Sequence, residues 1–441
     1  MAAAPEVIIP YHEVRDDLWR PLGPASGRYW IALSVAFAVA AWGLVCWGYQ
    51  IYAGIGVAGI RRPVFWGFYL VNFVFWIGIS HAGTLISAIL RLTDAGWRKP
   101  VTRVAEAITV FALSIGGMFP LIHLGRVWVF YWLIPYPNSR LLWPNFRSPL
   151  VWDLTAIVTY LTGSMIYLYL PLIPDLAQLA EETSGWRRRL YAALSLGWTG
   201  SDREWHTLEH AMKLMAGIIL AVAVSVHTVV AWDFSMSVAP GWHSTIFGPY
   251  FVTGAIFSGI AALLLVMTVL RKALHLEKYL LKRHFNNLSK LLLLLSVAWL
   301  YFTAAENLTM WYGNDPKEMQ VFGARVRGAY APFFWIMVFC NFVVPFVLLG
   351  IRRLRSITTA AISAACVLIG MWLERFLIII PTLATPRLAA AWGRYAPTWV
   401  EISISTATFA AMVMMYLLFS KLFPIISIWE FEPHPLEDED E

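Results

Sequence analysis

The sequence predicts an all-α polytopic membrane protein with about ten transmembrane helices. Hydrophobic residues make up 59% of the 441-residue chain and charged residues only 14%, whereas a soluble domain carries about 25% charged residues. Apolar runs long enough to cross a bilayer, about 20 residues each, recur along the whole chain. Aromatic residues reach 15%, which suits a protein with belts of Trp and Tyr at both membrane interfaces.

Ten apolar runs are expected to form the spans. In order, they cover residues 29–53, 64–90, 104–133, 149–171, 207–232, 246–270, 288–312, 329–350, 357–382 and 398–423. Several contain Pro or Gly, which membrane helices tolerate when neighbouring groups satisfy the backbone. The predicted divisions are an N-terminal segment (1–28), a first helix with its loop (29–63), two four-helix bundles (64–232 and 246–382), a last helix (398–423) and an acidic tail (424–441).

The distribution of Lys and Arg between the loops predicts the orientation of the chain. Loops on the side of the N-terminus, here named side A, hold 21 of the 33 Lys and Arg residues, and the opposite side B holds 9. Because basic loops stay in the cytoplasm, side A and both termini are expected to be cytoplasmic. The terminal residues LEDEDE are expected to form a solvated acidic end.

A weak internal repeat supports the two predicted bundles. The stretch WGFYLVNFVFWIG (66–78) resembles FGPYFVTGAIFSG (247–259), with two Gly, one Tyr and one Val aligned. Both stretches open a helix that enters from side B, so the repeat is parallel. Parallel repeats in membrane proteins often flank a functional site, although chance similarity between aromatic-rich helices stays open as an explanation.

The three cysteines predict no metal centre within this chain. Cys46, Cys340 and Cys366 all fall in apolar runs and form no CxxC motif, so neither an iron–sulfur cluster nor a zinc site is expected. A haem with two histidine ligands is a weaker alternative, since only His81, His123 and His227 lie deep in the spans.

His123, Asp153 and Arg375 are expected to share one depth near side B. The third run passes from side A to side B, so His123 lies past its middle, and Asp153 opens the fourth run at side B. Arg375 follows Glu374 in the side-B half of the ninth run. Ionisable groups at membrane depth are costly and point to function.

Oxidation of a quinol is a reaction that needs a base, a carboxylate and a cation at one site, because two hydroxyl protons must leave together with two electrons. His123 would accept one hydroxyl proton and Asp153 another, while Arg375 would keep the carboxylate ionised. A buried ion network that only holds helices together stays open as the alternative. Arg126 either shapes the pocket with Glu374 or anchors the third helix at the interface.

A second set of ionisable residues threads the predicted membrane and is a candidate proton path. Its members are His81, Asp94, Glu106, His227, Asp233 and Glu306. A transporter or proton channel without redox chemistry is therefore the main interpretation that involves no enzyme.

Four long blocks resemble the NrfD/PsrC-type membrane subunits, and most closely the ActC subunit of bacterial alternative complex III. They are HAGTLISAILRL (81–92), PLIHLGRVWVFYWLIPYPNSRLLWPNFRSPLVWDLTA (120–156), LIPDLA (172–177) and SVHTVVAWDFSMSVAPGWHSTIFGPYFVTGAIFSG (225–259). The resemblance covers nearly all of the second to ninth spans and agrees with the count of ten.

The resemblance implies a multi-pass subunit of the bacterial inner membrane that binds and oxidises menaquinol near the periplasmic face, within the first bundle, and is not active alone. It implies no haem or iron–sulfur cluster in this chain. The implied partners are a periplasmic iron–sulfur subunit, haem-c subunits, a second NrfD-like subunit and the lipid bilayer, without nucleic acid. The pocket residues of the family match His123, Asp153 and Arg375. Its proton-path residues match less closely. A non-redox, proton-conducting scaffold subunit is the alternative within the same family.

Overall fold

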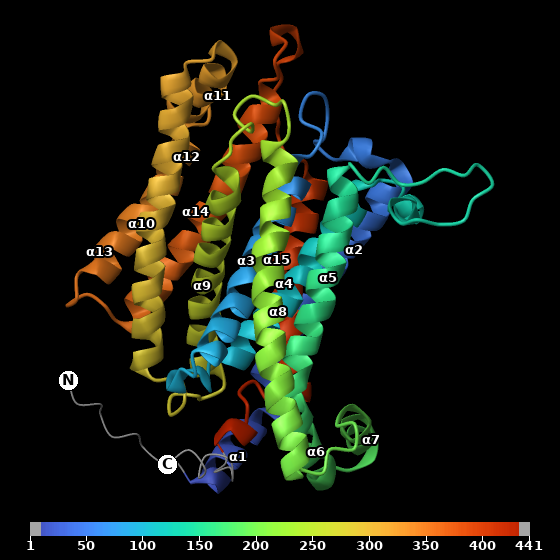
Figure 1. The fold of residues 1–441 in the computed structure, drawn as a ribbon, viewed down its shortest axis with the longest axis vertical. Coiled ribbons are helices and arrows are strands. Elements are labelled where there is room, and N and C mark those ends of the chain that lie inside the picture. Colours follow the sequence, from blue (N-terminus) through green and yellow to red (C-terminus); the bar gives the residue numbers. More distant parts are fainter. Residues whose placement is uncertain (1–9, 432–441) are drawn as a thin grey trace.

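The computed structural model describes residues 10–431, and within that range the chain is all-α, with no β-strand (Figure 1). Ten helices of the described part are long and apolar enough to cross a membrane, which confirms the fold class expected from composition. Residues 1–9 and 432–441, including the LEDEDE end, lie outside the described residues.

The long helices lie close to the expected runs. They are α2 (Gly27–Ala53), α3 (Gly67–Leu92), α4 (Thr102–His123), α5 (Pro149–Tyr169), α8 (Asp202–Ser235), α9 (Phe247–Ala273), α10 (Lys282–Gly313), α14 (Ile357–Ala384) and α15 (Trp399–Leu422). Shorter helices are α1 (Tyr11–Trp19), α6 (Ile173–Glu182), α7 (Gly185–Leu194), α11 (Pro316–Val326), α12 (Ala331–Val338) and α13 (Val344–Gly350). Single 3-10 turns occupy Arg20–Leu22, Ile55–Val57, Gly96–Arg98, Leu170–Leu172, Ala389–Ala391 and Trp429–Phe431, and a longer 3-10 segment covers Val127–Leu133.

The third span is shorter than the apolar run predicts. The α-helix ends at His123, and Gly125 adopts a φ of +66°, a left-handed conformation that stops a helix and that glycine adopts at little cost. The aromatic residues 127–133 form a separate 3-10 segment instead. His123 therefore stands at the side-B end of α4 rather than inside a longer helix.

The eighth span contains a π-helical turn, Phe339–Val343, between α12 and α13. The π-helical turn forms because Pro345 has no backbone N–H to donate to the preceding turn. The hydroxyl of Ser296 on α10 donates a hydrogen bond of 2.6 Å to the carbonyl of Asn341, the group that a regular helix would have paired with residue 345. A neighbouring helix thus satisfies the backbone that the proline leaves open.

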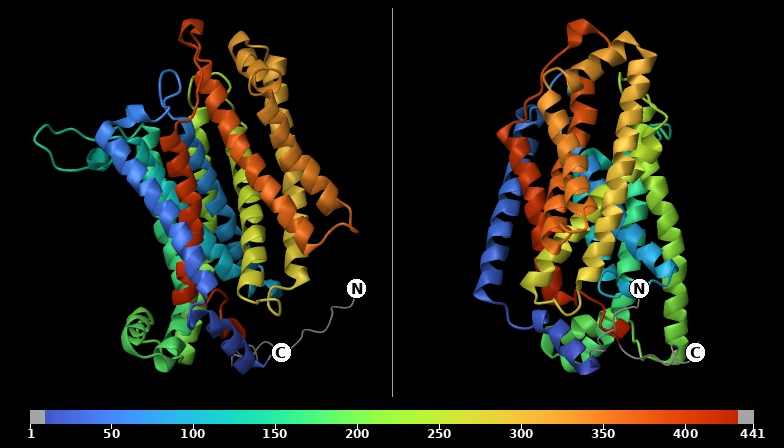
Figure 2. Two further views of the ribbon diagram at one scale, coloured as in Figure 1. Left: turned by 180° about the vertical axis from the view of Figure 1, so that it is seen from behind. Right: turned by 90° about the vertical axis from the view of Figure 1, so that its left-hand side faces the viewer.

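The helix α3 is the central element of the fold. It packs against α4, α8, α9 and α14, while α2 and α15 pack together as a pair (Figure 2). The α2–α15 pair comes close at Gly43, where any Cβ would collide with Ala407. The helices α3, α4, α5 and α8 pack as one group and α9, α10, α12, α13 and α14 as another; their equivalence as a repeat stays a prediction.

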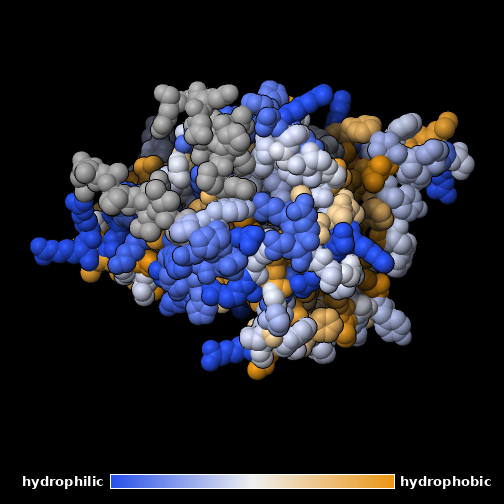
Figure 3. All heavy atoms as spheres, turned by 90° about the horizontal axis from the view of Figure 1, so that it is seen from below, coloured by the Kyte–Doolittle hydropathy of each residue, from blue (hydrophilic) through white to orange (hydrophobic). Residues whose placement is uncertain are grey.

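The side-A end carries α1, α6 and α7, and hydrophilic side chains gather on this face (Figure 3). A buried ion pair anchors the chain after α15 here. Nη1 of Arg103 lies 2.5 Å from Oδ2 of Asp175, and the Asp175 carboxylate also accepts the backbone N–H groups of Ile428 and Trp429. The C-terminal segment is therefore held across the side-A end of α3 and α4.

Candidate functional site

His123 lies half-buried where α4 ends at side B. Its imidazole stacks on the indole of Trp66, with ring centroids 4.1 Å apart, and Tyr69 approaches edge-on at 6.5 Å. Gln50 of α2 fixes this helix end, because its amide donates to the Ile122 carbonyl at 2.9 Å and its oxygen accepts from Tyr69. The Nδ1 atom of His123 is buried and has no hydrogen-bond partner.

Asp153 pairs with Asp233, a residue assigned from sequence to a different group. Asp153 lies in the first turns of α5 and Asp233 in the last turn of α8. The two carboxyl groups are electrostatic neighbours, and the Oδ1 atom of each is buried without a hydrogen-bond partner. Such a pair takes up and releases protons as a unit.

The packing of α4 on α5 places His123 close to the level of this pair. A Cβ at Gly117 would lie 3.3 Å from Ile157, so these two positions are level. The helices run antiparallel, and His123 lies six residues beyond Gly117 while Asp153 lies four residues before Ile157. At 1.5 Å per residue, the two side chains differ in height by about 3 Å.

Arg375 lies elsewhere, and the expectation of one shared depth is wrong for it. Its guanidinium packs on Gly78 and Gly254, and lies 4.7 Å from the ring centre of Phe251. Gly78 is twelve residues along the chain from Trp66, which His123 contacts. The corresponding distance along α3 is about 18 Å. Side chains tilt toward the N-terminus of their helix, and in α14 this direction leads toward side A.

Arg375 and Glu374 form a buried pair of their own, as their adjacency suggests. Nη1 of Arg375 lies 3.0 Å from Oε2 of Glu374, and the indole of Trp299 donates to Oε1 of the same carboxylate at 2.6 Å. This fixes Glu374 against α10.

His81 and His227 meet at the centre of the bundle, where Arg375 is an electrostatic neighbour of both. Their ring centroids lie 4.4 Å apart, and Tyr160 approaches His81 at 4.8 Å. The two rings are in direct contact, so no porphyrin fits between this particular pair. Neither ring nitrogen of His227 has a hydrogen-bond partner.

A column of polar groups continues from His81 toward side A along one face of α3. Thr84 donates to Thr109 at 2.9 Å, and Thr109 donates to the Ser80 carbonyl. One turn further, Ser87 donates to Glu106 at 2.5 Å. The spacing of three to four residues places all these side chains on one helix face.

Glu430 closes this column at its side-A end. Its carboxylate lies 2.5 Å from Nη1 of Arg98 and 3.4 Å from Nη2 of Arg91. Burial acts to raise the pKa of Glu430, but Arg98 and Arg91 outweigh it and hold that pKa below the ordinary glutamate value.

The remaining sequence candidates lie apart from this column. Glu306 accepts a hydrogen bond of 2.7 Å from Ser244 and, together with Arg325, lines a cavity of about 30 Å³ in the second bundle, room for about one or two water molecules. Asp94 and Arg126 are exposed at sides A and B, so neither lines a buried site.

Several partners of the site escape sequence reasoning. Trp66, Gln50 and Tyr69 form the surroundings of His123, but they look like ordinary members of apolar helices. Arg103 and Glu430 carry a detectable signal, since each is a charge beside an apolar run; their partners depend on tertiary packing. Among the described residues, no group of three or more His, Cys, Asp or Glu is placed to hold a metal ion.

Comparison with known proteins identifies the family. Residues 56–387 match the polysulphide reductase NrfD family, and the chain belongs to that family. It is 27% identical to a putative membrane subunit of the dimethyl sulfoxide reductase of Halobacterium salinarum, over 88% of this chain and 90% of the relative. It is 22% identical to a subunit of the selenate reductase of Mesobacillus selenatarsenatis, over 86% and 90%.

A third relative is the Hdr-like menaquinol oxidoreductase integral membrane subunit of Archaeoglobus fulgidus. It is 23% identical, over 81% of this chain and 80% of its own length. All three relatives are named as subunits of oxidoreductases, and two of the three names specify a membrane subunit.

Proposed function

We propose that the chain is the quinol-oxidising membrane subunit of a multi-protein oxidoreductase, with its quinol site beside His123 at side B. The observation that carries this proposal is the half-buried imidazole with an unpartnered Nδ1, level with the carboxyl pair of Asp153 and Asp233. The relative named as a menaquinol oxidoreductase subunit supports menaquinol as the substrate.

The proposed chemistry releases two protons and two electrons from one quinol. The Nδ1 atom of His123 accepts one hydroxyl proton, and the Asp153–Asp233 pair accepts the other. Trp66 offers a flat apolar face beside the imidazole, which suits an aromatic head group. In the proposal, both electrons leave to an iron–sulfur subunit docked on side B.

In the proposal, Arg375 does not act on the carboxylate of Asp153, as its position in the sequence suggests. It lies beside Glu374 and near His81 and His227, about 18 Å along α3 from the level of His123. In the proposal, it sets the charge of the central histidine pair. Protons move between this centre and the carboxyl pair along α8, where His227 lies six residues below Asp233.

The test measures quinol oxidation in the intact complex. His123→Ala and Asp153→Asn are expected to lower the rate at least about 100-fold, because positioned acid–base groups contribute about 10²–10⁴-fold. Arg140→Gln is the matched control, since Arg140 is exposed in a side-B loop and has no part in the proposed site, and it should keep the wild-type rate. Wild-type rates in both site variants, with normal assembly, would refute the proposal.

The wider assembly follows the same proposal. The complex is an alternative complex III, in which this chain is the ActC-type subunit, and electrons continue through haem-c subunits beside a second NrfD-like subunit. Side A then faces the cytoplasm and side B the periplasm of a bacterial inner membrane. Cysteines placed at Arg140 and Arg189, both exposed, should react with an impermeant thiol reagent added to whole cells only at position 140.

A proton-conducting subunit without a quinol site is the second candidate. The polar column from His81 to Glu430 favours it, because that column needs no quinol to carry protons. Quinone extracted in stoichiometric amount from the purified complex, and lost in His123→Ala, separates the two functions.

A further inference from the structure

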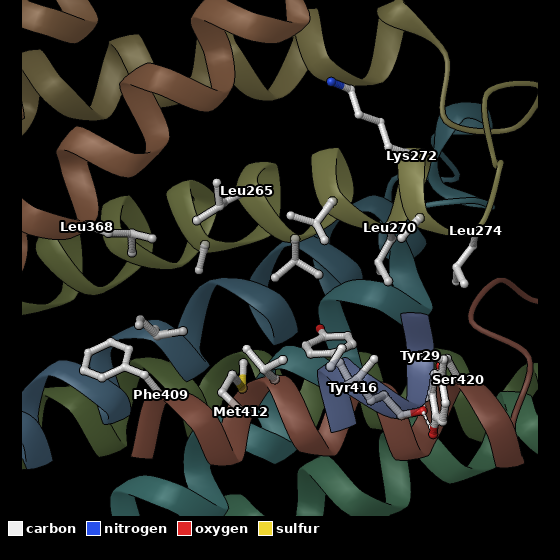
Figure 4. Close-up of a pocket in the computed structure, with 18 of the residues that line it drawn as sticks. Tyr29, Leu265, Leu270, Lys272, Leu274, Leu368, Phe409, Met412, Tyr416 and Ser420 are labelled. Carbon is white, nitrogen blue, oxygen red and sulfur yellow. Dashed lines mark hydrogen bonds between the residues drawn. The ribbon is translucent and has the colours of Figure 1, made fainter. Parts of the chain in front are cut away.

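A large open groove runs along the membrane-facing side of the molecule, between the α2–α15 pair and the helices α3, α9 and α14 (Figure 4). Its volume of about 1630 Å³ exceeds the roughly 300–1,000 Å³ of ordinary small-molecule pockets. None of His123, Asp153 and Arg375 lines it. The groove is therefore separate from the proposed quinol site.

The walls of the groove present hydrocarbon. One wall carries Leu265 and Leu270, and the facing wall carries Phe409 and Met412 (Figure 4). The polar groups on its floor are already paired among themselves. Asn72 bonds to Ser405 at 2.8 Å and to Trp372 at 2.9 Å, and Trp76 donates to Thr408. The groove thus suits an apolar occupant.

The side-A end of the groove is cationic. Its basic lining residues in the described chain are Arg20, Arg28, Lys272, His275 and Lys421, and no Asp or Glu of that part lines it. Lys421 is used internally, since its Nζ donates to the carbonyls of Pro21 and Gly23. Arg28 and Lys272 are exposed, and within the part of the chain that the structure describes neither has a carboxylate partner.

The dimensions match one leaflet of a bilayer. The α9 wall runs from Ala262 to Lys272, which is about 15 Å of helix. One leaflet contributes about half of the roughly 30 Å hydrocarbon core. Cations at the interface, with a hydrocarbon surface one leaflet deep below them, are complementary in shape and charge to an anionic membrane lipid.

We propose that this groove is a binding site for an anionic phospholipid of the side-A leaflet. The phosphate and its head group lie between Arg28 and Lys272, and the acyl chains lie between α9 and α15. A neutral quinol head group would gain no ion-pair attraction from these cations, whereas an anionic head group gains one ion-paired, charge-assisted contact from each.

The experiment titrates the detergent-purified complex with dioleoyl-phosphatidylglycerol and with dioleoyl-phosphatidylcholine, and counts bound lipids by native mass spectrometry. A cation near an anionic lipid is worth about fivefold in affinity, so Arg28→Gln with Lys272→Gln should weaken phosphatidylglycerol binding about 30-fold. Arg188→Gln with Arg189→Gln is the matched control, because both residues are exposed on the short helix α7 and do not line the groove. The control should change affinity less than about twofold.

A second variant tests the chains independently of the charges. Val269→Trp adds bulk to the groove from an exposed position and should reduce the bound lipid without disturbing the core. Equal affinity for the two lipids, or equal loss in the two double variants, would overturn the proposal. So would a partner helix in the groove, seen as a cross-link from a cysteine at position 269 to another subunit.

Discussion

Asp175→Asn is expected to destabilise the protein strongly, because among the described residues Asp175 is the one carboxylate in contact with the buried guanidinium of Arg103. Arg103 is 1% exposed, and apart from Asp175 its bonds go to the carbonyls of Pro171, Pro424 and Ile426 and to the Ser427 hydroxyl. Breaking one side of a buried ion pair costs about 3–5 kcal/mol. The carbonyl partners remain, so the lower end of that range, about 3 kcal/mol, applies.

The assay is thermal unfolding of the detergent-purified protein. At about 2 °C per kcal/mol, a loss of 3 kcal/mol lowers the apparent Tm by about 6 °C. Trypsin should also cut the segment 424–431 faster, because Asp175 holds the backbone of that segment. Glu182→Gln is the control: its pair with Arg15, at 3.1 Å, is largely exposed and is worth less than about 1 kcal/mol. An equal and small effect of both substitutions would refute the reasoning.

Two further outcomes follow from the structure. Two arginines hold the pKa of Glu430 below its ordinary value against the effect of burial. The charge of Glu430 therefore stabilises the fold above about pH 4.5, and this stabilisation is lost as the pH falls through the lowered pKa of the folded state. Apparent Tm values of wild type and Glu430→Gln should differ most at neutral pH and converge in acid. Ser296→Ala removes the hydrogen bond to the Asn341 carbonyl and should cost about 0.5–1.5 kcal/mol, which the same thermal assay detects as a fall of a few degrees.

Hydropathy was sufficient to predict the fold class and the number of spans, because the cost of burying backbone in lipid forces every long apolar run into a helix. The predicted helix boundaries are wrong where an apolar segment does not continue as a regular α-helix. The residues 127–133 are as apolar as a span, but Gly125 ends α4 before them. Pro345 breaks the eighth span into two α-helices and a π-turn, a change that hydropathy cannot register.

The sequence proposes the residues of the candidate site one by one, but it does not propose which of them pair. Glu374 and Arg375 are adjacent in sequence, and their ion pair is present. The predicted depth of the Arg375 side chain was wrong, because a position within a span gives the height of the Cα atom and not the direction of a long side chain. Pairs between helices, such as His81 with His227, depend on helix rotation, which sequence periodicity leaves open when all sides of a helix are apolar.

The contact between Asp153 and Asp233 joins two sets of residues that sequence reasoning kept separate. Asp153 was expected at the quinol site and Asp233 in the proton path, yet their carboxyl groups share one environment. A proton accepted at this pair is already at the side-B end of α8. This position is six residues, or about 9 Å along the helix, from His227. If quinol oxidation occurs beside His123, the acceptor and the entrance of the path are then the same group. Asp153→Asn and Asp233→Asn should therefore impair the rate to a similar degree, whereas separate roles would leave one of the two variants active.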